Sequence, residues 1–208
     1  MIPKIQIKYS KLLDPIFIFY CQNNPDLKKR GWDKWIPPTK EELDKRIENY
    51  KKAWGEVETK VLPSMCSILG LQFKNNIIDV HIVSGNSRQL SSPLVIKSGY
   101  VPRDFVSTLM HELIHVLCAD NEDILPKLET LYQDKGDLSI TIKNHIITHA
   151  VLKYLYLDVL NDPKMLEENL AVSKAHSTSD YTKAWEIVDS VGYLNVINEF
   201  RKKFTSKN

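Results

Sequence analysis

The sequence contains few cysteines and no long apolar run, and each shortage argues against a class of protein. Its 208 residues include three cysteines, Cys21, Cys66 and Cys118, an odd number at wide spacing without a CxxC pair. This pattern indicates neither a disulfide framework nor a cysteine zinc site, and it favours a reducing compartment. The longest apolar stretch near the N-terminus, residues 16–21, is much too short to span a bilayer.

The chain also lacks an excess of either charge. Its formal net charge is +2, and its 28 basic and 26 acidic side chains are mixed along the sequence. We therefore expect no nucleic-acid partner and no polyanionic partner. The first residues lack a basic segment followed by a long apolar core, so we expect no signal peptide, no membrane partner and a cytoplasmic location. The sequence gives no indication of oligomeric state.

The pattern of apolar residues predicts a small β-sheet early in the chain. Residues 4–9 and 77–83 alternate apolar and polar side chains, and residues 93–97 form a short apolar run that ends at Ser98-Gly99. All three segments are expected to be strands. Residues 16–20 fit either a strand or a buried helix. Residues 23–38 are rich in Asn, Pro, Gly and Trp and are expected to be irregular.

Helices are expected after each group of strands. Thr39 and Glu42 have the spacing of a capping box, so a long helix should cover residues 40–61 until Pro63 breaks or restarts it. After Pro102 the expected helices are 103–118, 123–133, 139–160, 163–175, 179–190 and 193–204. The predicted fold class is therefore α+β, with a small N-terminal and central sheet and a mostly helical C-terminal half. We expect one domain over residues 1–208, with an α/β lobe at 1–100 that includes an edge strand and a helical lobe at 101–208.

Residues 111–115 read His-Glu-Leu-Ile-His, the HExxH pattern. On a helix of 3.6 residues per turn, His111 and His115 project from one face, where their imidazoles can reach one zinc ion. Glu112 lies about 100° around the helix, beside the metal, and can take a proton from a zinc-bound water. Outside the motif, residues 105–119 contain no charged side chain. Burying two histidines and a glutamate there is costly without a partner, and Zn²⁺ is the expected one.

A catalytic zinc needs a third protein ligand and one open position. Of the six histidines, His145 and His149 lie farther along on a predicted helix at i and i+4, and they are the leading candidates. Asp158 and Asp162 follow them. The alternative for one of the two histidines is a hydrogen-bonded residue of the core.

The order of two strands, an HExxH helix and a second helix with a metal ligand resembles the gluzincin branch of the zincin metallopeptidases. In thermolysin-like members the second helix reads Asn-Glu-x-x-Ser-Asp, where the glutamate binds zinc and the aspartate orients a histidine of HExxH. Residues 144–149 read Asn-His-Ile-Ile-Thr-His. The resemblance therefore implies His145 as the zinc ligand and His149 as the orienting residue. Because histidine replaces both acids, the reverse assignment also stays open.

The resemblance covers residues 77–160 and is strongest at HExxH. The metzincin extension HExxHxxGxxH is absent, since Cys118 and Asn121 occupy its glycine and last histidine positions. Zincins often use a downstream tyrosine or histidine to stabilise the oxyanion, and His176 and Tyr181, on either side of Ser177–Asp180, are candidates for this role. The alternative is a surface histidine and a tyrosine that packs the next helix. Cys118 is expected to be a small core residue.

These residues predict a zinc metallopeptidase. A peptide or protein substrate would pair with the strand at residues 77–83, and a zinc-activated water would attack its carbonyl with Glu112 as general base. Two other readings remain open. One is a zincin-fold metal-binding protein with a regulatory or interaction role and no peptidase activity, against which the intact Glu112 argues. The other is a zinc hydrolase of a non-peptide amide.

Overall fold

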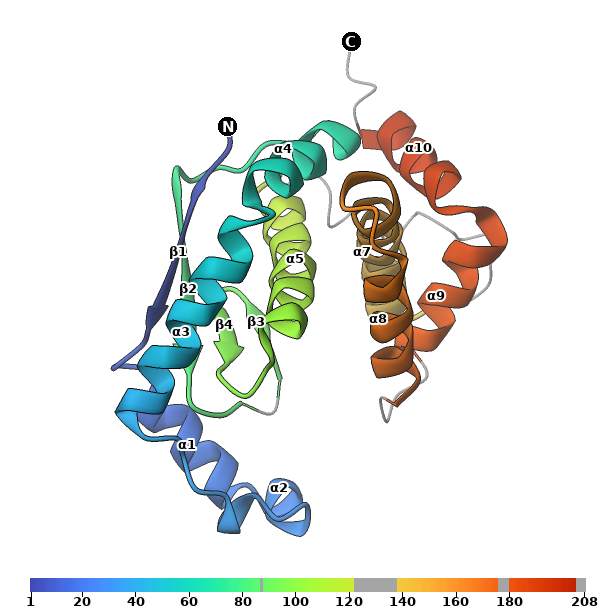
Figure 1. The fold of residues 1–208 in the computed structure, drawn as a ribbon. Coiled ribbons are helices and arrows are strands. Elements are labelled where there is room, and N and C mark those ends of the chain that lie inside the picture. The colour runs from blue at the N-terminus through green and yellow to red at the C-terminus, as the bar shows by residue number, and fades with distance from the viewer. Residues whose placement is uncertain (87, 122–137, 176–179, 205–208) are drawn as a thin grey trace. The chain divides into compact units, whose positions relative to one another are not determined.

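The computed structural model describes residues 1–86, 88–121, 138–175 and 180–204 (Figure 1). The chain divides into two compact units, each built from segments far apart in sequence. Unit 1 comprises Met1–Ile2, Glu58–Lys74 and Leu113–Asn208, and unit 2 comprises Pro3–Val57 and Asn75–Glu112. Helix α5 (Pro102–Ala119) is continuous, and its first part belongs to unit 2 and its last part to unit 1.

Unit 2 contains a four-stranded mixed sheet in the order β1-β2-β4-β3. Strands β1 (Lys4–Tyr9), β2 (Ile77–Val83) and β4 (Leu94–Lys97) run parallel, and the short β3 (Leu90–Ser91) is antiparallel to β4. The strands predicted at residues 4–9, 77–83 and 93–97 are thus confirmed. The expectation that the strand at residues 77–83 offers its edge to a peptide is wrong, because β2 is hydrogen-bonded to β1 on one side and to β4 on the other.

Helix α3 (Lys40–Gly55) packs against β1, and its Tyr50 contacts the start of α5. Its predicted capping box is present, with the Thr39 side chain accepting from the Glu42 N–H and Glu42 accepting from the Thr39 N–H. The buried Tyr50 ring stacks on Phe105 of α5 with a centroid separation of 4.1 Å. The Tyr50 hydroxyl lies 2.6 Å from the Ser98 carbonyl oxygen and 2.7 Å from that of Tyr100. One buried phenol therefore holds the loop between β4 and α5.

The segment between β1 and α3 is more helical than its composition suggests. Residues 16–20 lie in α1 (Asp14–Asn23), a largely exposed helix whose buried residues are Asp14 and Cys21. The prediction that residues 23–38 are irregular is wrong in part, because α2 (Pro25–Lys29) and the 3₁₀ turn η1 (Trp32–Lys34) form there. Asn24 starts α2 by accepting hydrogen bonds from two backbone N–H groups, and Pro25 fits the first turn because it has no N–H to satisfy.

Unit 1 is helical around the buried α7 (Ile140–Tyr154), which packs against α9 (Asp180–Val191) and α10 (Tyr193–Phe204). A single π-helical turn, η3 (Leu155–Val159), follows α7 and leads to α8 (Pro163–Ala175). The helices predicted at 103–118, 139–160, 163–175, 179–190 and 193–204 are confirmed, with η3 forming the end of the second. The helix predicted at 123–133 lies outside the described residues.

The long helix predicted at residues 40–61 is instead two helices. The first ends at Gly55, and α4 (Glu58–Leu69) begins in unit 1 with Pro63 inside it. Pro63 therefore neither ends nor starts a helix. The small mixed sheet with its many helices confirms the α+β class. None of the described helices combines the length and the apolar character needed to cross a membrane.

Replacing Tyr50 with phenylalanine tests the anchor between α3 and the loop before α5. The change keeps the ring stacked on Phe105 but removes the hydroxyl group that lies within hydrogen-bond distance of the Ser98 and Tyr100 carbonyl oxygens. We expect the free energy of unfolding to fall by about 1–3 kcal/mol, the usual cost of leaving a buried polar group unsatisfied. Urea denaturation measures it, with the half-exposed Tyr20→Phe as control. Equal stability of Tyr50→Phe and wild type would contradict this role.

Candidate metal centre

Helix α5 carries two histidines and a glutamate in its second half, where the other residues are uncharged. His111 and His115 are one turn apart and half-buried. The residues around them are fully buried, namely Leu109, Met110, Leu113, Ile114 and Leu117, all with an exposed fraction of 0%. The apolar residues hold the helix in the core, and the two imidazoles project together from what remains of its surface. This is the arrangement that the i, i+4 spacing predicts.

Helix α7 supplies a third imidazole from the same unit as His115. His145 is buried, and its Nδ1 lies 2.7 Å from the carbonyl oxygen of Thr141, one turn earlier. Because a carbonyl can only accept, the Nδ1 of His145 carries the hydrogen and donates it. The lone pair of a neutral His145 is then on Nε2. A hydrogen bond of this kind fixes the tautomer and the orientation of a metal-binding histidine.

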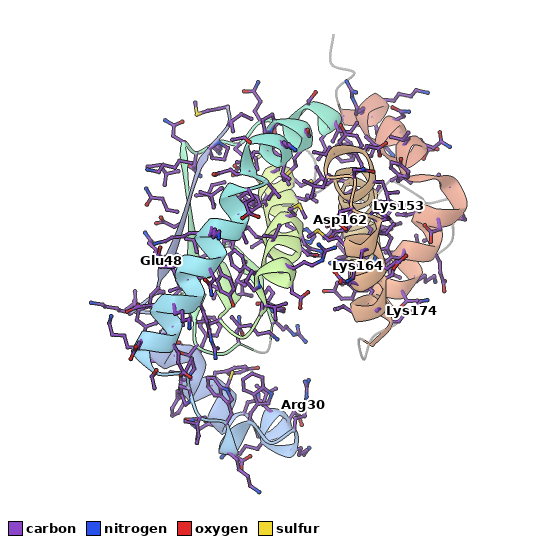
Figure 2. The ribbon with its side chains drawn as sticks, in the orientation of Figure 1. Arg30, Glu48, Lys153, Asp162, Lys164 and Lys174 are labelled. Carbon is purple, nitrogen blue, oxygen red and sulfur yellow. The ribbon has the colours of Figure 1, made fainter. Side chains whose placement is uncertain are left out.

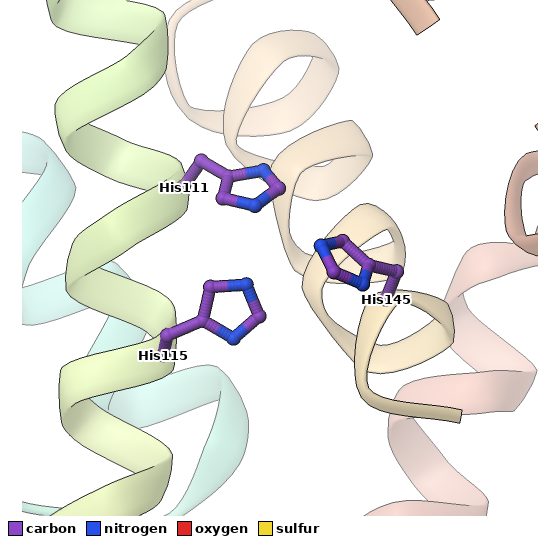
Figure 3. Close-up of side chains that lie close together, drawn as sticks. All are labelled: His111, His115 and His145. Carbon is purple, nitrogen blue, oxygen red and sulfur yellow. The ribbon is translucent and has the colours of Figure 1, made fainter. Parts of the chain in front are cut away.

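The three imidazoles converge. Each of His111, His115 and His145 offers one nitrogen, and these nitrogens all lie within 4.8 Å of one another. The rings come from α5 and α7 and face a common centre (Figure 3). In a tetrahedral zinc site with bonds of about 2.0–2.1 Å the ligand nitrogens are about 3.3 Å apart, so small side-chain rotations suffice. Three histidines that could hold a metal ion are therefore present.

His149 has a different environment from His145. Its exposed fraction is 1%, and its ring stacks on Trp185 of α9 with centroids 4.3 Å apart and planes 11° apart. Its ring centroid is 5.5 Å from that of His145. Burial lowers the pKa of His149 well below its ordinary value, and the nearby His145 and His115 add to this. Of the two candidates for a third ligand, His145 joins the cluster and His149 lies behind it, against Trp185.

The imidazole of His115 is also kept neutral. Burial, with a smaller effect of His145, lowers its pKa to about 3. Two cationic imidazoles with ring centroids 5.1 Å apart would repel each other, so the pair favours the neutral form. Neutral imidazole is the form that binds a metal. The electrostatics of the cluster thus suit a cation better than they suit protons.

Glu112 is buried and oriented by a residue from the edge of the sheet. Its exposed fraction is 7%, and its Oε2 accepts a hydrogen bond of 2.6 Å from the Ser91 hydroxyl of β3. Burial raises the pKa of Glu112, and the hydrogen bond from Ser91 partly offsets that rise. A carboxyl group with a raised pKa accepts and returns protons closer to neutral pH than an exposed glutamate does.

Tyr181 lies beside the cluster. Its ring centroid is 4.3 Å from that of His145 and 6.2 Å from that of His149. Its position near the third histidine keeps it a candidate for binding a developing oxyanion. His176, the other candidate, lies outside the described residues. Cys118 is a free thiol with an exposed fraction of 4%, and burial raises its pKa to about 12, as suits a core residue.

Sequence reasoning missed three residues of this site. Ser91 fixes Glu112, Thr141 fixes His145 and Trp185 packs on His149. A signal existed for Trp185, which follows Tyr181 by four residues and so shares its face of α9. Thr141 could have been found in the same way, four residues before His145. Ser91 gave no signal, because its contact with Glu112 depends on how the chain folds between residues 91 and 112.

Comparisons with known proteins add no relative. No family model, curated protein or solved structure matches this chain.

Phenylalanine substitutions distinguish the ligand from its neighbour. His145→Phe removes a nitrogen from the cluster, so we expect zinc retention to be lost. His149→Phe keeps a ring to stack on Trp185, so zinc affinity should fall by no more than the roughly 10–100-fold that loss of a supporting contact costs. Competition with a chromophoric chelator measures both affinities. Retention by His145→Phe together with loss in His149→Phe would reverse the assignment.

Proposed function

We propose that this chain is a zinc-dependent metallopeptidase of the HExxH type with a gluzincin-like arrangement. His111, His115 and His145 hold the zinc ion, and Glu112 is the general base. The observation that carries the proposal is the convergence of three imidazoles, two of which lie on the same helix as the buried Glu112. A peptide or protein is the substrate.

The donor set favours zinc among the common metals. Three imidazole ligands suit zinc, and a catalytic zinc site has three protein ligands with its fourth position open to water or substrate. Zinc bound there would polarise a carbonyl group and lower the pKa of a water molecule. The hydrogen bond from His145 to the Thr141 carbonyl supports this reading, since histidine ligands of zinc usually donate their other N–H to such a group.

Glu112 moves the protons of the reaction. One of its oxygens, Oε2, accepts from Ser91, which leaves Oε1 to accept a proton from the attacking water. The water oxygen bonds to the scissile carbonyl carbon while Glu112 holds the proton. Glu112 then gives it to the amide nitrogen as the C–N bond breaks. The second proton of the water passes from the new carboxylic acid to the amine, so the products are a carboxylate and an ammonium group. Burial excludes competing water from this carboxylate.

The edge of the sheet offers a place for the substrate. Strand β3 ends the sheet within the described residues, and it pairs with β4 on its other side. An extended peptide can add to such an edge through backbone hydrogen bonds. Since Ser91 of β3 also holds Glu112, a peptide along β3 would pass the general base. Tyr181, next to His145, is the residue we assign to the oxyanion.

The substitution Glu112→Gln tests the catalytic part of the proposal. It keeps the size of the side chain and the acceptor for Ser91 but removes the base. We expect zinc content and fold to survive, while hydrolysis falls by about 10²–10⁴-fold. Cleavage of a peptide library, followed by mass spectrometry, measures the loss. The exposed Glu48→Gln on α3 serves as a control that keeps full activity (Figure 2).

Two outcomes would contradict the proposal. Equal cleavage by wild type and Glu112→Gln would show that another group, or another protein in the sample, acts as the base. Zinc binding by wild type with no cleavage of any peptide would favour a metal-binding protein without peptidase activity or a hydrolase of a non-peptide amide.

A further inference from the structure

Lys97, at the end of β4, is a cation in an unusual setting. Its side chain is half-buried, and its ammonium lies 4.8 Å from the centroid of the Tyr100 ring. Its backbone N–H donates to the side-chain oxygen of Gln89, at 3.3 Å. Gln89 in turn donates from Nε2 to the Tyr100 hydroxyl, at 2.6 Å. Lys97, Tyr100 and Gln89 thus form one connected cluster beside strand β3.

The charge of Lys97 has no carboxylate partner among the described residues. Other lysines of the chain have one, as in the 2.6 Å pairs of Lys8 with Asp79 and of Lys153 with Asp189. Arg30, an exposed cation that follows α2 (Figure 2), acts on Lys97 through its positive charge. Burial, and after it Arg30, lowers the pKa of Lys97. A half-buried ammonium without a carboxylate partner, repelled by a second and exposed cation, is stabilised by an anion.

Residues at and just before β3 connect this cluster to the general base. Ser91 at one end of β3 bonds to Glu112, and Gln89, just before β3, bonds to the backbone of Lys97. The two points are two residues apart, which corresponds to about 6.6–6.8 Å along an extended strand. Tyr100 joins them from the side, since it contacts Lys97 and also interacts with Glu112. A peptide along β3 would therefore pass Ser91, which holds the base, and Gln89, which holds the backbone of Lys97, about two residues apart.

We propose that Lys97, assisted by Arg30, binds a carboxylate of the substrate about two residues from the scissile bond. The inference rests on the proposed peptidase function and narrows its substrates to acidic peptides. The carboxylate is that of an aspartate or glutamate side chain, or that of a free C-terminus. Tyr100 positions the ammonium through its ring.

Peptide binding tests this assignment without hydrolysis. The protein is zinc-loaded Glu112→Gln, and the probes are three fluorescent hexapeptide pools that are random except at one fixed position. The first carries an internal glutamate and an amidated C-terminus, the second a glutamine and an amidated C-terminus, and the third a glutamine and a free C-terminus. Fluorescence anisotropy gives the affinities. We expect tighter binding of the first or the third pool than of the second, by about 10-fold or more, as for one charge-assisted hydrogen bond. Which of the two is preferred identifies the source of the carboxylate.

Variants of Lys97 in the same background assign the preference to the residue. Lys97→Gln should abolish it, Lys97→Arg should keep it, and Arg30→Gln should reduce it. Lys51→Gln, a change to a surface lysine paired with Glu48, should leave it unchanged. Thermal melting checks the fold, and Lys97→Gln should melt no lower than its parent, because it removes a repelled charge. Equal affinities for the three pools, no binding of any pool, or a preference that survives Lys97→Gln would each overturn the proposal.

Cleavage by wild type separates this inference from the proposed function. Cleavage of the three pools at equal rates, with equal binding, would support a peptidase and overturn the acidic preference. A binding preference that depends on Lys97, without cleavage of any pool, would support the anion site and overturn the peptidase.

Discussion

The rest of the site depends on three polar side chains that helix α5 places among buried apolar residues. Glu112 is buried and His111 and His115 are half-buried, between leucine, isoleucine and methionine side chains with no exposure. Polar groups in such a position are costly unless each has a partner. Ser91 satisfies Glu112 from the sheet. Burial lowers the pKa of His115, and His145 completes with His111 and His115 a set of donors that suits a metal cation.

The parts of the fold set by local pattern could be predicted from the sequence. The alternation of Ile5 and Ile7 predicts β1, the capping box predicts the start of α3, and the i, i+4 histidines predict one face of α5. Each signal is contained within one turn or one strand. The choice between His145 and His149 is different in kind, because both lie on one face of α7. It depends on which of them packs against Trp185 of another helix.

The pairing of the strands could not be predicted from the sequence either. The alternation within residues 77–83 predicts a strand but does not say how many neighbours it has, and β2 has two. The contact of Ser91 with Glu112 likewise depends on strand order. Strand β3 pairs with β4 at the end of the sheet, and from there Ser91 bonds to Glu112 of α5. The composition of residues 23–38 predicted an irregular segment, but Asn24 and Pro25 start a helix there. The position of β3 at the edge of the sheet therefore could not be predicted from the sequence.

Zinc content combined with X-ray absorption measures whether the three histidines bind a metal ion. Protein purified without chelator should contain about one zinc per chain, with a nitrogen shell at about 2.0–2.1 Å that includes histidine scattering. His111→Ala and His115→Ala should each remove the metal, because each deletes one of the converging nitrogens. Protein that contains no transition metal and does not bind added zinc would show that these histidines do not form a zinc site.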